Sequence, residues 1–202
     1  MLDMDCGRIL LSLARNTIAE HLSQRGTSGG KAVSFQSGMA GMEVTQLDWL
    51  HRPGATFVTL TLQGELRGCI GSLQAHCTLI EDVRHNAAAA AFGDPRFLPL
   101  THEEFGEIEV EVSLLTAPEA LGFTDEADAL AQLRPDMDGV VLEYGRYRST
   151  FLPQVWEHFP QPHQFLMMLK RKAGLPADFW AEDVKLSRYC VTKWREKDFQ
   201  NG

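Results

Sequence analysis

The sequence has no run of apolar residues near the ~20 that a bilayer-spanning helix needs, and its first residues lack a basic segment followed by an apolar stretch. Its four cysteines form no C-x-x-C pair, and a chain of 202 residues needs no disulfides for stability. The formal net charge of −8 argues against broad binding to nucleic-acid phosphates. We therefore expect a cytoplasmic protein with reduced thiols and no membrane segment.

The apolar residues, 44% of the chain, are enough to bury a core. Apolar spacing, capping signals and glycine turns predict helices over about 5–23, 79–92, 125–133 and 165–173, and strands over 56–62, 107–115, 139–144, 146–152 and 184–194. Strands and helices are intermixed with hairpins and show no βαβ rhythm. These patterns predict an α+β fold, with antiparallel or mixed sheets and helices packed on them.

The stretch Leu66-Arg67-Gly68-Cys69-Ile70-Gly71 sets a guanidinium and a thiol between glycines, just after a predicted hairpin turn. Glycines inside a strand usually mark a bulge or the close approach of another backbone or a ligand. Strand alternation would place Arg67 and Cys69 on one face, where the cation would favour the thiolate. Cys69 is therefore a candidate nucleophile or ligand contact, and an inert buried cysteine is the alternative.

A catalytic thiol normally needs a base, and the histidines in the same half of the chain are His76, His85 and His102. Each of them is equally explained as a surface residue or a helix cap. Cysteine and histidine spacings fit no zinc pattern, so no metal or other cofactor is expected. The glutamates of the predicted strand 107–115 are better explained as a solvated face than as metal ligands.

Basic residues outside the hexapeptide suggest two further sites. The prolines of 94–100 predict a stiff, extended loop, in which Arg96 either binds an anionic ligand or braces the loop by pairing with Asp94 or another acid. The cluster at 170–172 leaves RNA or nucleotide binding as an alternative, although cations at a helix end also stabilise the helix dipole. The glycine- and serine-rich segment 23–41 predicts a loop, and its 26–31 stretch departs from the phosphate-loop spacing.

In their order along the chain, these motifs resemble the AMMECR-one domain family, whose bacterial and archaeal members are called AmmeMemoRadiSam system protein A. The matching stretches are Leu66 to Gly71, Asp94-Pro95-Arg96-Phe97 and Glu111-Val112-Ser113-Leu114-Leu115. The resemblance implies a single AMMECR-type domain over residues 1–202. It also implies two pseudo-equivalent lobes, which we expect to meet near 115–140.

The family name implies a Memo-like protein and a radical S-adenosylmethionine protein as partners, but no particular reaction. We expect a cleft around the hexapeptide that binds a small anionic or modified substrate. The candidate contacts, besides Cys69, are Arg67, Gly68, Gly71, Asp94 and Arg96. Two alternatives stay open: a non-catalytic adaptor for the same partners, in which the hexapeptide is only a structural bend, and an RNA- or nucleotide-binding module in 144–197.

Overall fold

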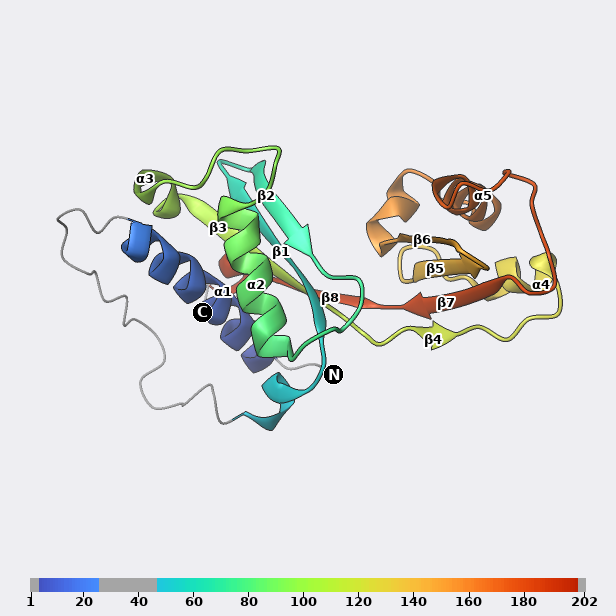
Figure 1. The fold of residues 1–202 in the computed structure, drawn as a ribbon, viewed down its shortest axis with the longest axis horizontal. Coiled ribbons are helices and arrows are strands. Elements are labelled where there is room, and N and C mark those ends of the chain that lie inside the picture. Colours follow the sequence, from blue (N-terminus) through green and yellow to red (C-terminus); the bar gives the residue numbers. More distant parts are fainter. Residues whose placement is uncertain (1–3, 26–46, 200–202) are drawn as a thin grey trace. The chain divides into compact units, whose positions relative to one another are not determined.

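The computed structural model describes residues 4–25 and 47–199, which belong to two compact units (Figure 1). The first unit comprises residues 1–115 and 192–202, and the second comprises residues 116–191. Most of the predicted loop at 23–41, including its 26–31 stretch, lies outside the described residues. That the two units form a single domain stays a prediction.

The first unit contains a four-stranded sheet with strand order β2-β1-β3-β8. Strand β1 pairs antiparallel with both β2 and β3, and its hairpin with β2 turns at Gln63 and Gly64, which both have positive φ. The described elements of this unit are α1 (Met4–Arg25), η2 (Asp48–His51), β1 (Ala55–Leu62), β2 (Glu65–Gly71), α2 (Leu79–Phe92), α3 (His102–Phe105), β3 (Ile108–Leu115), β8 (Val191–Arg195) and η4 (Glu196–Phe199).

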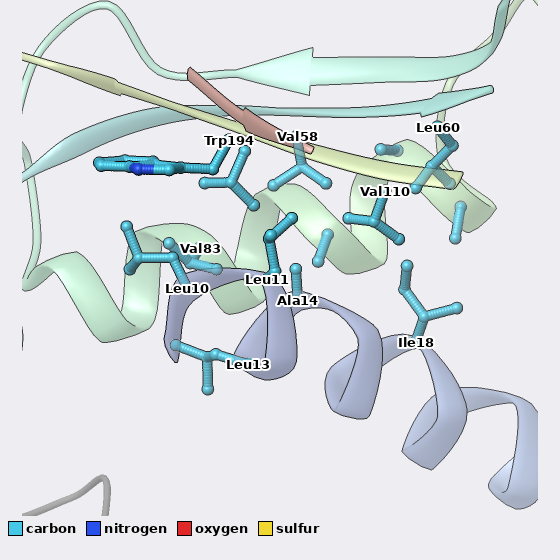
Figure 2. Packing of buried hydrophobic residues seen from close by; sticks show 14 of the residues in the cluster. Leu10, Leu11, Leu13, Ala14, Ile18, Val58, Leu60, Val83, Val110 and Trp194 are labelled. Carbon is cyan, nitrogen blue, oxygen red and sulfur yellow. The ribbon is translucent and has the colours of Figure 1, made fainter. Parts of the chain in front are cut away.

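The core of the first unit lies between the sheet and the helices α1 and α2. Leu10, Ala14 and Ile18 recur at helical spacing on α1 and are fully buried. Figure 2 shows them directed toward the sheet, where Val58 of β1 and Val110 of β3 point back at them. The predicted amphipathic helix that packs on a sheet is therefore confirmed, and it extends slightly beyond the predicted 5–23.

Helix α2 approaches strand β2 closely because the facing residues are small. A Cβ on Gly68 would lie 2.2 Å from the carbonyl oxygen of Ala90, so only glycine fits there without a backbone shift. The predicted capping box is present, since Glu81 accepts a hydrogen bond from the Thr78 amide at 3.1 Å. A glycine after a helix often ends it through a left-handed conformation, but Gly93 has a φ of −127°, and its amide simply continues the helical bonding to the Ala89 carbonyl.

The strand predicted over 184–194 is in fact two strands that belong to different sheets. Strand β7 (Lys185–Tyr189) lies in the second unit and β8 in the first, with a break at Cys190. Trp194 then packs on α1, where a Cβ on Gly7 would lie 2.3 Å from its ring. Because the apolar pattern runs on across the break, the sequence alone gave no signal for the change of sheet.

The second unit contains a four-stranded sheet with strand order β4-β7-β5-β6. As predicted, β5 and β6 form a hairpin that turns at Gly145, which has positive φ. Trp156 stacks on Phe165 with 3.8 Å between ring centroids and donates to the Asp138 carbonyl at 2.7 Å. The remaining elements are β4 (Glu119–Ala120), α4 (Glu126–Gln132), β5 (Gly139–Tyr144), β6 (Tyr147–Phe151), η3 (Pro153–Glu157) and α5 (Pro162–Lys172).

The contact between Gly68 and Ala90 generates a stability prediction. Gly68→Ala should lower the free energy of unfolding by about 1–3 kcal/mol, because the new methyl group meets backbone that must move. Gly106→Ala in the same unit is the control, since its nearest neighbour is 3.7 Å away and its φ of −70° suits alanine. Urea unfolding followed by circular dichroism measures both variants, and equal stabilities would contradict the proposed packing.

Candidate functional site

Strand β2 contains a β-bulge at the hexapeptide. Leu60 of β1 faces Gly68, and the next residue, Thr61, faces Leu66, so Arg67 is an extra residue on β2. A bulge changes the direction of side chains at the edge of a sheet. The bulge, one of the predictions for a strand with these glycines, interrupts the alternation from which we expected Arg67 and Cys69 to share a face, so their common face stays a prediction.

The Arg67 side chain reaches the segment that follows α2. Its Nε and Nη2 donate to the two carboxylate oxygens of Glu104 at 2.8 and 3.0 Å, and Nη2 also donates to the Leu98 carbonyl at 2.9 Å. These bonds with Arg67 lower the pKa of Glu104, which also accepts from the Thr101 amide. The Arg67 side chain is only 11% exposed, and its Nη1 is buried without a hydrogen-bond partner.

Asp94 and Arg96 close the outer edge of β2 at Cys69. The Cys69 amide donates to Asp94 Oδ2 at 2.9 Å, and the Cys69 carbonyl accepts from Arg96 Nη2 at 3.2 Å. Arg96 also binds both Asp94 oxygens, through Nε at 2.9 Å and Nη2 at 2.7 Å. The two side chains thus make the bonds to the backbone of β2 that a neighbouring strand would make. Of the two roles predicted for Arg96, the structure contains the bracing one, in which Arg96 pairs with Asp94.

Hydrogen bonds hold the pKa of the buried Asp94 carboxyl well below its usual range, first from the Arg96 side chain and then from the Cys69 and Arg96 amides. Asp94 therefore stays ionised at physiological pH. The Arg96 side chain is 53% exposed, and its Nη1 has no hydrogen bond within the part of the chain that the structure describes. Arg96 is thus fixed by one side of its guanidinium and open on the other.

The Cys69 side chain is half-buried and accepts a hydrogen bond from Thr59 Oγ1, with 3.2 Å between oxygen and sulfur. His76, His85 and His102 are all exposed, and within residues 4–25 and 47–199 no histidine or carboxylate hydrogen-bonds to the Cys69 sulfur. None of the predicted bases is thus in place to accept a proton from this thiol.

Both glycines of the hexapeptide have packing explanations. Gly68 makes room for the Ala90 carbonyl, and a Cβ on Gly71 would lie 2.2 Å from the ring of Phe57 on the neighbouring strand. Phe57 therefore covers the backbone at Gly71, which is a way of packing a strand glycine. A ligand contact at either glycine stays a prediction, and neither glycine requires one.

Phe97 lies beside both arginines of the site. Its ring centroid is 5.8 Å from Arg67 Cζ and 5.5 Å from Arg96 Cζ, within the range of cation–π attraction. In Figure 1 the segment between α2 and α3, which carries Phe97, passes beside the hairpin of β1 and β2. The structure thus brings Arg67, Cys69, Asp94 and Arg96 together.

A buried polar network that the sequence analysis missed holds the end of β2. Asp82 Oδ2 accepts from the Thr56 amide and hydroxyl at 2.7 and 2.6 Å, and Asn86 donates to the Thr56 carbonyl at 3.0 Å. The Ser72 amide, directly after the hexapeptide, donates to the same carbonyl at 2.8 Å. The sequence contained a signal for this network, because Asp82 and Asn86 lie four residues apart on an otherwise apolar face of the helix.

The basic cluster at 170–172 is largely engaged within the second unit. Lys170 is only 2% exposed and donates to Glu126 at 2.6 Å, and Lys172 donates to the Thr150 carbonyl at 2.9 Å. This geometry favours the structural explanation of the cluster over a phosphate-binding surface. Within residues 4–25 and 47–199, no three His, Cys, Asp or Glu side chains are grouped as metal ligands, and no helix could span a membrane.

Comparisons with known proteins agree with the family resemblance. The AMMECR1 family model matches residues 11–194. A protein of Methanothermobacter thermautotrophicus is 37% identical over 197 residues, which cover 96% of either chain. A protein of Methanocaldococcus jannaschii is 45% identical over 127 residues, covering 62% of this chain and 63% of the relative. The crystal structure of an uncharacterized protein from Pyrococcus horikoshii is similar with a TM-score of 0.71 and 32% identity, covering 95% of this chain and 91% of that one.

The state of Asp94 predicts how stability depends on pH. Its pKa is lower in the folded protein than the value of ~3.9 in an unfolded chain, so its contribution is complete above that value and is lost as the pH falls below it. Asp94→Asn should lose about 1.5–3 kcal/mol of unfolding free energy at pH 7, because a charged acceptor of several bonds is removed. The difference from wild type should shrink between about pH 4 and pH 2.

Urea unfolding at a series of pH values measures this difference. Asp136→Asn is the control, because that carboxyl is exposed and lies in the second unit. If the unfolding free energies of Asp94→Asn and wild type differed by the same amount from pH 7 to pH 2, a charge-dependent role for Asp94 would be ruled out.

Proposed function

Because this chain belongs to the AMMECR1 family, we propose that it binds a small anionic or modified substrate beside β2 and acts together with a Memo-like protein and a radical S-adenosylmethionine protein. The substrate contacts are the guanidinium groups of Arg67 and Arg96, held in place by Glu104 and Asp94. Cys69 adjoins them as a ligand contact, and the absence of a neighbouring base favours binding over nucleophilic catalysis.

The unpartnered Nη1 of Arg67 carries this proposal. A buried donor without an acceptor costs about 1–3 kcal/mol, and a native structure usually has a reason for such a cost. Because this atom is buried in the free protein, an anionic ligand reaches it only after a neighbouring side chain moves aside, and the bond that it then forms would remove the cost. Glu104 already accepts from two other nitrogens of the same guanidinium, so the carboxylate that holds Arg67 does not serve Nη1.

Arg96 adds the accessible donor. Its side chain is half exposed, and its Nε and Nη2 are fixed by Asp94, which leaves Nη1 for a ligand. Fixing an arginine in advance reduces the entropy that a ligand must overcome on binding. Guanidinium groups suit carboxylates and phosphates, whose oxygens accept charge-assisted hydrogen bonds.

Titration of isotope-labelled protein with inorganic phosphate and with succinate tests the proposal by nuclear magnetic resonance. The amide signals of Cys69, Arg96 and Phe97 should shift, and the affinity should fall with rising salt. Arg96→Gln should weaken binding about tenfold, the equivalent of one charge-assisted hydrogen bond.

Arg148→Gln is the matched control, since Arg148 is similarly exposed at 39% and pairs with Glu143 in the second unit. Unchanged binding by Arg96→Gln, or an equal loss in Arg148→Gln, would contradict an anion site at β2.

The second candidate is an adaptor without a small-molecule ligand. Leu98, in the segment beside β2, is 83% exposed, and exposed apolar side chains that lie together are typical of protein interaction surfaces. In this case purified Memo-like and radical S-adenosylmethionine proteins should bind wild type, Arg67→Ala and Cys69→Ala equally well in a pull-down. A loss of pathway function in either variant despite equal binding would count against a purely adaptor role.

A further inference from the structure

Two exposed leucines adjoin the arginines of the proposed anion site. The described part of the chain has four exposed large hydrophobic residues, Met4, Leu66, Leu98 and Met137. Two of these four adjoin Arg67: Leu66, 43% exposed, precedes it, and the Leu98 carbonyl accepts a hydrogen bond from it. A single exposed leucine is common on protein surfaces and needs no explanation. Two exposed leucines beside the largely buried guanidinium of Arg67 are less common and call for one.

Leu66 and Leu98 differ in how they reach the surface. Leu66 lies opposite Thr61 just before the bulge, so its position follows from the register of β2. Leu98 stands in the stiff segment between Pro95 and Pro99, where its backbone is tied to Arg67. Both apolar side chains are therefore carried by fixed backbone, so a ligand does not have to order the backbone that presents them.

We propose that the occupant of this site is a short segment of a partner protein that places one carboxylate between apolar side chains. The inference rests on the proposed anion site, and it specifies that the ligand of this site is a protein segment and not a free small molecule. The carboxylate binds the exposed, unpartnered Nη1 of Arg96, and the apolar side chains pack on Leu66, Leu98 and Phe97. Arginine, aromatic and aliphatic groups together are typical of the centre of a protein interface.

Charge and size select this occupant. The carboxylates at the site, Asp94 and Glu104, are already paired with arginines, whereas Nη1 of Arg96 has no partner in the described residues and is available to an acceptor. Exposed Glu65 and Glu103 adjoin Leu66 and Glu104 in the chain and would repel a run of acidic residues, which favours a single carboxylate. A contact limited to two leucines and one ring is small beside the ~800 Å² per partner of a stable interface, so it suits a short segment better than a folded partner.

The test uses two blocked peptides with the sequences Gly-Leu-Glu-Leu-Gly and Gly-Leu-Gln-Leu-Gly, titrated into the full-length protein and followed by amide shifts. The glutamate peptide should shift signals of 66–69 and 94–98, and the glutamine peptide should bind about tenfold more weakly, since one charge-assisted contact is lost. Leu98→Ser should weaken the glutamate peptide about fivefold without changing phosphate binding. Met137→Ser, at an exposed apolar residue of the second unit, should bind like wild type.

Peptide binding that Leu98→Ser leaves unchanged, or that does not distinguish glutamate from glutamine, overturns the peptide assignment. If phosphate still competes at Arg96 in that case, the site binds a small anion and the proposed function stands. If neither the peptides nor phosphate shifts these signals, both proposals fail together.

Discussion

The close approach of α2 to β2 at Gly68 is the constraint on which the candidate site depends. Because the Ala90 carbonyl occupies the space of a side chain, the end of α2 lies against the edge strand. The segment after the helix then delivers Asp94 to the amide of Cys69, and Asp94 in turn fixes Arg96. The position of Arg96 therefore depends on the absence of a side chain at Gly68.

This arrangement changes which residues of the hexapeptide carry the functional argument. The thiol of Cys69 attracted attention in the sequence, but its side chain meets a threonine hydroxyl and none of the candidate bases. The two glycines are explained by packing against Ala90 and Phe57. What packing leaves unexplained is the buried, unpartnered nitrogen of Arg67, and a binding role accounts for it more directly than a catalytic one.

Most elements could be predicted from the sequence, since periodicity, capping boxes and turn glycines are local signals. The α+β class and the hairpins followed from such signals, and the pairing of Arg96 with Asp94 was one of the two roles that they left open. The bulge at Arg67 and the network around Asp82 could not be predicted, because each depends on which strand or helix lies opposite. The break at Cys190 was missed for a similar reason: residues on either side of it pack into different cores, and both cores require apolar side chains.

The first unit is discontinuous in the chain, and this bears on the order in which the protein folds during synthesis. Its sheet includes β8, its helix α1 packs on Trp194, and Arg15 binds Glu196, which also accepts from the Val110 amide at 2.9 Å. None of these contacts can form before residues 191–196 have left the ribosome. The second unit, continuous from 116 to 191, is complete earlier in synthesis, so the sheet of the first unit lacks its edge strand β8 until the second unit has been made.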